Sequence, residues 1–312
     1  MVDHHSAHSH SHSHSHSHSP PANFNRAFAI GLVLNVAFVA IEVFYGLMAD
    51  SIALLADAGH NFSDVLGLVM AWGASLLTRR QPSSRYTYGW RRSSILAAFL
   101  NALLLMVVTG GIVWEGVQRL FAPDAVQGET IIVVAIVGIV INSWTAFLFA
   151  SGRGSDLNLR AAFWHMTGDA LVSLGVVLAG IGILWTGWLW LDPAFSLVIS
   201  VVIVWNTWDV LKDSFNLAID AVPENIEERA VRLYLAELPQ VAQVHDLHIW
   251  AMSTTETALT AHLIMPAGHP GDAFLHRVCQ QLHDRFGIEH ATLQIELGDS
   301  PNSCGLAGNH CT

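Results

Sequence analysis

Histidine and aspartate stand four residues apart at two places inside long apolar segments. The first pair is His60 and Asp64, in the run that begins at Asp57. The second pair is His165 and Asp169. On an α-helix this spacing puts both side chains of a pair on one face, one turn apart. Polar groups in hydrocarbon are costly, so each pair is a functional hypothesis by default.

Together the pairs offer four ligands, namely His60, Asp64, His165 and Asp169. Two imidazole nitrogens and two carboxylate oxygens match a tetrahedral divalent metal such as zinc in number and type. These groups must be deprotonated to bind metal, and a free histidine titrates near about pH 6.5, so protons compete with the metal. We therefore predict a membrane metal transporter whose histidines carry counter-transported protons.

Asp57 lies three residues before His60, on nearly the same helix face. It could be a carboxylate that supports a ligand, a proton relay or a helix-end residue near the outer surface. We expect a supporting role and not direct ligation. Glu42 is another acidic residue within an apolar segment, and we expect it to face the interior of the protein or the path of the metal.

The composition is that of a membrane protein. Hydrophobic residues make up 52% of the chain and charged residues 12%, whereas soluble domains carry about 25% charged residues. Six apolar segments have roughly the 17–25 residues or more that a transmembrane helix needs. They span about residues 26–48, 51–77, 93–120, 130–150, 159–186 and 193–211. We predict an all-α bundle of six transmembrane helices.

Basic residues gather in alternate loops, which indicates the orientation of the helices. Five arginines lie between the second and third segments, and Lys212 follows the sixth. The positive-inside rule therefore places both termini in the cytoplasm. No strong basic patch lies outside these loops, so we expect no nucleic-acid partner.

From about Pro223 the sequence changes to that of a small soluble domain. Helical spacing at 224–238 and 272–286, with strand patterns at 241–252, 256–265 and 292–297, predicts the order α-β-β-α-β. Such an order predicts a two-layer α+β domain. The domains predicted are a tail at 1–23, a transmembrane domain at 24–215, a cytoplasmic domain at 216–298 and a tail at 299–312.

Both ends of the chain carry metal-ligating residue types. Residues 1–23 alternate histidine with serine, which predicts a disordered metal-binding tail, with a purification tag as the alternative. The three cysteines do not form a disulfide framework, because two of them stand in the C-terminal tail. That tail offers Cys304, His310 and Cys311.

These features together resemble the cation diffusion facilitator family. The resemblance is carried by six helices, a His-rich start, the two His-x-x-x-Asp pairs and the C-terminal α-β-β-α-β domain. The stretches Asp57–Asp64, Tyr88–Arg92, Leu96–Leu104 and Val244–Trp250 look like the family's bacterial zinc-type branch.

The resemblance implies a proton-coupled antiporter that exports divalent metal from the cytoplasm by alternating access, with zinc first and cadmium or cobalt tolerated. It implies a homodimer held together largely by metallochaperone-like cytoplasmic domains. It implies a location among the lipids of a bacterial cytoplasmic membrane. It also implies a protein without catalytic residues and without an organic cofactor. It also makes His245, His262 and Glu296 the best candidates for a regulatory zinc site. Cys304, His310 and Cys311 would add softer ligands from the tail.

The sequence departs from the family's pattern in one region. The loop Gln81–Gly89 contains neither aspartate nor histidine, so we expect no second metal site there. Ser93 and Ser94 follow Arg91-Arg92, where many relatives carry an acidic residue. The partners of these arginines are therefore left open.

Two other classes of function compete with transport. An intramembrane metalloenzyme needs an open coordination position for water, which four protein ligands would close. The sequence also lacks a His-Glu-x-x-His helix and a Gly-x-Ser-x-Gly turn. A membrane-anchored metal sensor would not need paired ligands on two helices.

Overall fold

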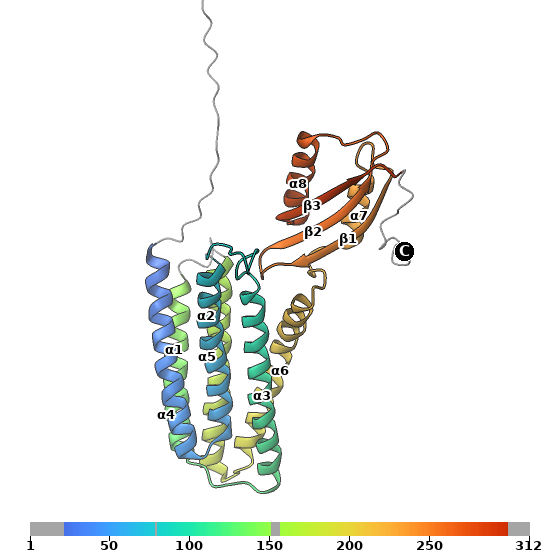
Figure 1. Cartoon of the computed structure of the whole chain (residues 1–312). Coiled ribbons are helices and arrows are strands. Elements are labelled where there is room, and N and C mark those ends of the chain that lie inside the picture. The colour runs from blue at the N-terminus through green and yellow to red at the C-terminus, as the bar shows by residue number, and fades with distance from the viewer. Residues whose placement is uncertain (1–21, 79, 151–156, 299–312) are drawn as a thin grey trace, which may run out of the picture.

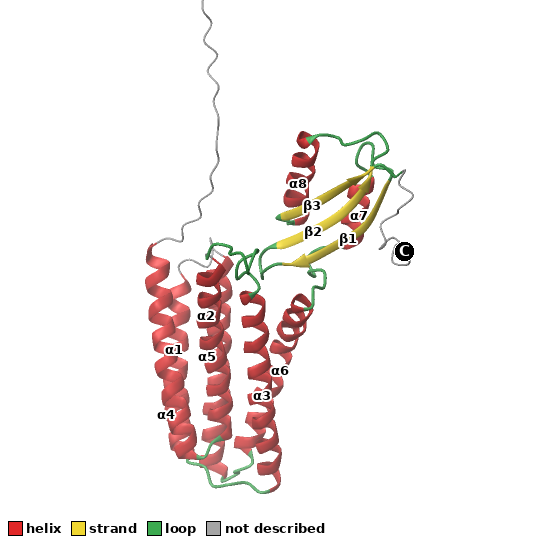
Figure 2. Ribbon diagram, viewed as in Figure 1, coloured by secondary structure: helices red, strands yellow, loops and turns green. Residues whose placement is uncertain are grey.

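The computed structural model describes residues 22–78, 80–150 and 157–298. Six long helices form a bundle, and a three-stranded sheet with two shorter helices lies beyond one end of it (Figures 1 and 2). The long helices are α1 (Ala22–Ala49), α2 (Ile52–Thr78), α3 (Ser93–Phe121), α4 (Gly128–Ala150), α5 (Leu157–Thr186) and α6 (Leu191–Ala218).

Among the described residues, five of these helices are long and apolar enough to cross a membrane, namely α1, α3, α4, α5 and α6. The sixth, α2, is equally long but carries Asp57, His60 and Asp64. It contacts α1, α3, α5 and α6, so its polar residues lie among other helices. Protein contacts of this kind are what make polar residues tolerable within a membrane.

Two differences between the observed and the predicted helix boundaries lie where the bundle leads into the sheet domain. The last long helix, α6, continues to Ala218, well past the predicted end at residue 211. The next helix, α7 (Glu228–Ala236), is shorter than predicted, because a turn closed by the Ile226 amide and the Pro223 carbonyl precedes it. The extra turns of α6 carry the chain out of the bundle toward the sheet (Figure 1).

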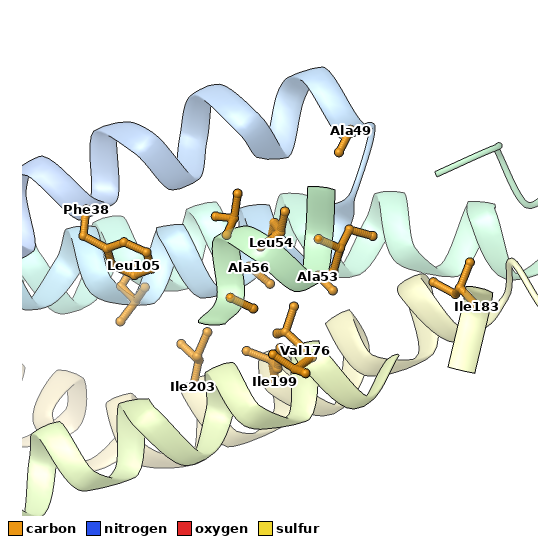
Figure 3. Close-up of a cluster of buried hydrophobic side chains, with 14 residues drawn as sticks. Phe38, Ala49, Ala53, Leu54, Ala56, Leu105, Val176, Ile183, Ile199 and Ile203 are labelled. Carbon is orange, nitrogen blue, oxygen red and sulfur yellow. The ribbon is translucent and has the colours of Figure 1, made fainter. Parts of the chain in front are cut away.

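The bundle is closed by a buried apolar cluster whose members come from all the long helices (Figure 3). Ala53 and Ala56 of α2 are fully buried, as is Val176 of α5. Small side chains let helix backbones approach closely, which is how helices pack in lipid. Further members of the cluster are Phe38, Ala49, Leu54, Leu105, Ile183, Ile199 and Ile203.

The sheet has the strand order β1-β2-β3. Strand β1 (Gln243–Ala251) pairs antiparallel with β2 (Thr257–Ile264), and β3 (His290–Glu296) pairs parallel with β2. Helices α7 and α8 (Asp272–Phe286) pack on one face, where Leu235 and Leu282 meet Leu259 and Leu263 in a second apolar cluster. Alternation along β2 turns Thr260 and His262 to the other face. The element order is the predicted α-β-β-α-β.

Polar contacts join the sheet to the start of α3. Arg91 Nη1 lies 2.8 Å from Glu256 Oε1, in the turn between β1 and β2. Arg92 forms an ion pair with Asp220, just after α6. The Thr254 amide donates a hydrogen bond to Ser94 Oγ over 3.1 Å. The arginines whose partners the sequence left open thus connect the bundle with the sheet domain.

Candidate metal centre

The two His-x-x-x-Asp pairs face each other between α2 and α5, which run in opposite directions (Figure 1). His60 Nε2 lies 3.3 Å from Asp169 Oδ1. His165 Nε2 lies 3.2 Å from Asp64 Oδ2. In an antiparallel pair of helices, each histidine therefore faces the aspartate of the other helix.

The distances within each helix complete a ring. His60 Nε2 lies 3.7 Å from Asp64 Oδ2, and His165 Nε2 lies 3.8 Å from Asp169 Oδ2. Each imidazole thus stands between two carboxylates, and each carboxylate stands between two imidazoles. We call these four side chains the ring.

The ring has the chemistry of a metal site. Ligand atoms of His60, Asp64 and Asp169 all lie within 4.8 Å of one another. His165 approaches both carboxylates but lies outside this tight group, with its ring centroid 6.1 Å from that of His60. In the part of the chain that the structure describes, Asp64 Oδ2 and Asp169 Oδ2 are buried without a hydrogen-bond partner. Buried polar atoms are usually satisfied, and a cation between the carboxylates would satisfy both.

Exposure changes across the ring. The two ring side chains nearer the sheet domain are His165, which is 44% exposed, and Asp64, which is 25% exposed. The two deeper side chains are His60, which is 16% exposed, and Asp169, which is 3% exposed. Beyond Asp169 the buried apolar cluster closes the bundle. The two ring side chains nearer the sheet domain are therefore more exposed than the two deeper ones.

The start of α2 is held by an acidic residue of α6. Asp192 is buried and accepts hydrogen bonds from Ser51 Oγ and from the Ile52 amide, the latter over 2.8 Å. A carboxylate at a helix N-terminus satisfies amides that have no partner within the helix. This cap ties the ligand-bearing helix α2 to α6.

Asp57 lies outside the ring and is fully buried. Its Oδ2 accepts a hydrogen bond from Ser173 Oγ of α5 over 2.9 Å. Glu42 of α1 is buried as well, and Asn61 Nδ2 donates to its Oε2 over 3.0 Å. Asn61 was not predicted as a functional residue, although a polar residue next to His60 in an apolar run was a signal for it.

A second cluster lies on the uncovered face of the sheet. His245 and His262 stand directly opposite each other on β1 and β2, with ring centroids 5.1 Å apart. Glu296 of β3 contacts both, with Oε2 3.1 Å from His245 Nε2 and Oε1 2.9 Å from His262 Nδ1. The structure thus brings these three predicted residues together, with ligand atoms within 4.8 Å.

The electrostatics of this cluster favour a charged carboxylate. Burial alone would raise the pKa of Glu296, but hydrogen bonds from Gln294 and His245, together with nearby His262, lower it below its usual value. His245 Nδ1 is buried and has no hydrogen-bond partner among the described residues. Two imidazoles and one carboxylate are a donor set that zinc takes, so the residues present fit the ion.

Asp246 joins this cluster and was missed in the sequence. Strict alternation along β1 would turn it away from His245. The strand register shifts between His245 and His248, and Asp246 has a φ of 50°. A β-bulge of this kind redirects a side chain. Asp246 Oδ2 consequently lies 3.4 Å from His262 Nε2.

The tails lie almost wholly outside the described residues. This holds for the histidine-serine run at 1–21 and for Cys304, His310 and Cys311. Their predicted metal binding stays a prediction.

Comparison with known proteins covers most of the chain. The family model described as the cation efflux transmembrane domain matches residues 28–217. The one described as the cation efflux protein, cytoplasmic domain, matches residues 223–297. The two matches confirm the predicted fold class, a six-helix membrane bundle followed by a cytoplasmic α+β domain.

Curated relatives agree with the family models. The chain is 37% identical over 279 residues to the zinc transporter ZitB of Escherichia coli (strain K12), covering 89% of each chain. It is 36% identical over 278 residues to the metal cation efflux system protein CzcD of Cupriavidus metallidurans, covering 89% of this chain and 88% of the relative. It is 31% identical over 272 residues to a cadmium, cobalt and zinc/H(+)-K(+) antiporter of Bacillus velezensis, covering 86% and 87%.

These relatives are transporters, so the prediction of a transporter and not an enzyme is confirmed. The two family models follow one another along the chain and leave only a short linker between them. The ring lies within the first and the sheet cluster within the second. The chain belongs to the cation efflux family, and it is a multi-pass membrane protein.

Proposed function

We propose that this protein exports divalent metal ions from the cytoplasm in exchange for protons, with zinc as the first substrate and cadmium or cobalt as alternatives. The observation that carries the proposal is the closed ring of His60, Asp64, His165 and Asp169 inside a membrane bundle. Relatives named as zinc transporters and as a cadmium, cobalt and zinc antiporter support this choice of metals.

Ligand chemistry explains why the ring suits export. Two carboxylates and two neutral imidazoles balance the charge of a divalent ion and fill a tetrahedral shell. The same imidazoles bind protons once the metal has left, since metal and protons compete for the same nitrogens. One site can therefore carry metal in one direction and protons in the other.

The graded exposure of the ring supports an inward-open arrangement. His165 and Asp64 are the more exposed ligands, and they lie toward the sheet domain. Metal would enter from that side, while the apolar cluster blocks the other side. Rearrangement of α2 against α5, which contact each other much less than α4 and α5 do, would then open the opposite side. This is alternating access.

Orientation and assembly follow from the loops and the second domain. The arginine-rich loops support an orientation with both termini in the cytoplasm of a bacterial cell and the bundle in its cytoplasmic membrane. Exposed apolar side chains such as Val33, Phe44 and Trp205 would face lipid. A second copy of the chain would join through the cytoplasmic domain to form a homodimer.

We further propose that His245, His262 and Glu296 hold a regulatory zinc ion, with Asp246 beside them. A bound ion would fix β1, β2 and β3 to one another, because its ligands come from all three strands. Asp57 would support the ring through its bond to Ser173.

Transport into sealed liposomes tests the function. Purified protein should move zinc when a proton gradient of the correct direction is imposed, and it should move protons in return. Asp64→Asn and Asp169→Asn should each abolish the flux. The control is Asp209→Asn, since Asp209 is an exposed aspartate of α6 with no role in the ring. Persistent zinc flux in both ring variants would contradict the assignment of the ring as the transport site.

A further inference from the structure

We propose that the loop between α2 and α3 binds the headgroup of an anionic phospholipid, in the leaflet on the sheet-domain side of the membrane. The site consists of Arg80, Arg85, Tyr86 and Trp90, which we call the basic-aromatic patch. The inference rests on the membrane location of the bundle and on the geometry of this loop. It does not depend on which ion the ring carries.

The position of the basic-aromatic patch matches the surface of a membrane. Arg80 lies two residues beyond the end of α2. Trp90 precedes α3 by three residues, and its carbonyl accepts a hydrogen bond from the Ser93 amide over 3.0 Å. Helix α3, which is long and apolar enough to cross a membrane, begins at Ser93. The patch therefore lies at the height of the lipid headgroups, at the end of the bundle that is nearer the sheet domain (Figure 1).

The loop is folded so that distant parts of it lie side by side. The Ser83 amide donates a hydrogen bond to the Tyr86 carbonyl over 3.0 Å, and the Gly89 amide donates to the same carbonyl over 2.9 Å. Gly89 has a φ of 72°, and a Cβ atom on it would lie 3.4 Å from the Arg80 carbonyl oxygen. A residue without a side chain favours this backbone conformation. The turn thus brings the chain at Arg80 next to Gly89, the residue before Trp90.

Two aromatic rings lie beside each other in the patch. The ring centroids of Tyr86 and Trp90 lie 4.5 Å apart, and the guanidinium carbon of Arg85 lies 5.8 Å from the Tyr86 centroid. Tyr86 and Trp90 are each 40% exposed. Rings of these two types gather at membrane interfaces, because each has an apolar body and a polar end. The first turns of α3 also expose Leu96 and Leu100, which offer an apolar surface to acyl chains.

The two arginines of the patch lack an acidic partner within the described part of the chain. Arg91 and Arg92, from the same loop, are ion-paired with acidic residues, whereas Arg80 and Arg85 form no ion pair there. Residues 65–114 contain no aspartate or glutamate. An aromatic ring does not neutralise a guanidinium group, so both charges are left for a ligand from outside the loop.

Other residues of the same loop contact the sheet domain. The Tyr88 ring centroid lies 5.6 Å from that of His290 on β3, and Arg91 pairs with Glu256. Where the structure describes the chain, the residues of the patch form no ion pair or hydrogen bond with the sheet domain. The loop would therefore hold the sheet domain through one set of residues and a lipid through another.

The phosphate of a lipid headgroup suits the charges of the patch. A guanidinium group can bind two phosphate oxygens through parallel hydrogen bonds. Basic residues beside a membrane helix attract anionic lipids, and the attraction acts within about 10 Å of the surface. A zwitterionic lipid also has a phosphate, but its own cationic group compensates the charge. The patch should therefore prefer phosphatidylglycerol to phosphatidylcholine.

Native mass spectrometry of the full-length protein tests the proposal. Delipidated protein is titrated with phosphatidylglycerol or with phosphatidylcholine, and the dissociation constant of the first bound lipid is measured. Phosphatidylglycerol should bind the unmodified protein more tightly than phosphatidylcholine does. The double variant Arg80→Gln/Arg85→Gln should bind phosphatidylglycerol about 10-fold more weakly, because two charges near the headgroup are lost. Its affinity for phosphatidylcholine should not change.

The matched control is Arg229→Gln/Arg277→Gln, which removes the same charge from exposed positions of α7 and α8. This control should bind phosphatidylglycerol like the unmodified protein. An equal loss of affinity in the control, or no loss in the patch variant, would overturn the proposal. Glycerol 3-phosphate carries an anionic phosphate without acyl chains. If it displaces the bound lipid, the patch is a site for free phosphate and the lipid assignment is wrong.

Hydrogen exchange tests the unmodified protein alone, so its outcome does not depend on the folding of a variant. In vesicles of phosphatidylglycerol the amides of residues 80–90 should exchange more slowly than in vesicles of phosphatidylcholine. The amides of α8 should exchange equally in both. Equal exchange of residues 80–90 in the two kinds of vesicle contradicts the proposal. Failure of metal transport would bear only on the proposed function, because neither lipid measurement involves zinc.

Discussion

Arg91 Nη1 lies 2.8 Å from Glu256 Oε1, so the start of α3 is ion-paired with the turn between β1 and β2. The hydrogen bond from the Thr254 amide to Ser94 lies beside this pair. The turn belongs to the two strands that carry His245 and His262. A movement of these strands would therefore change the position of the start of α3. This helix packs against the ligand-bearing helix α2.

A charge exchange tests this contact. Arg91→Glu should loosen the β1–β2 turn, because two carboxylates would then face each other. The loss should be small, about 0.2–1 kcal/mol, because both side chains are about one-third exposed. The double variant Arg91→Glu/Glu256→Arg should restore the contact. Hydrogen exchange of residues 252–257 measures both effects, and equal protection in all three proteins would show that the pair contributes nothing.

His60→Asp should shift the metal preference of the ring. It replaces an imidazole nitrogen by a carboxylate oxygen, which suits manganese and other harder cations better than zinc. The ratio of zinc affinity to manganese affinity should therefore fall, by about 10-fold or more, which corresponds to about 1.4 kcal/mol. Competition binding with purified protein measures it. Asp209→Asn should leave the ratio unchanged, and an unchanged ratio in His60→Asp would argue against His60 as a ligand.

Zinc stoichiometry separates the ring from the sheet cluster. The protein should bind zinc at both sites, and His262→Ala should remove one equivalent per chain while the ring still binds. The reason is that His262 contacts both Glu296 and Asp246, so its loss breaks the sheet cluster. Equilibrium dialysis counts the equivalents. His276→Ala, on α8, is the matched control, because His276 takes no part in the cluster of His245, His262 and Glu296.

The thiol of Cys279 on α8 gives a pH-dependent prediction. Burial raises the pKa of this thiol above its usual value. A raised pKa means less thiolate at a given pH, and the thiolate is the form that reacts. Alkylation of Cys279 should therefore be slower than that of free cysteine near pH 8 and should accelerate toward higher pH. Mass spectrometry of the Cys279 peptide follows the rate, and the slowing should vanish in denaturant.

Local features of the sequence were enough for much of the architecture. The apolar lengths predicted the membrane helices, and the strand and helix patterns after Pro223 predicted the order of the sheet domain. The four-residue spacing in each pair predicted that His60 and Asp64, like His165 and Asp169, share a helix face. Such periodicities depend only on the geometry of a single helix or strand.

What the sequence determined by itself is therefore the set of ligand types, their places on two membrane helices and the class of fold. Only the tertiary structure decided that His60 faces Asp169, that Asp246 turns toward His262 and that Asn61 donates a hydrogen bond to Glu42. The first depends on the register of two antiparallel helices, the second on a β-bulge and the third on the packing of α1 against α2. Each is set by contacts between segments distant in the chain or by an irregularity in the strand, which residue spacing does not encode.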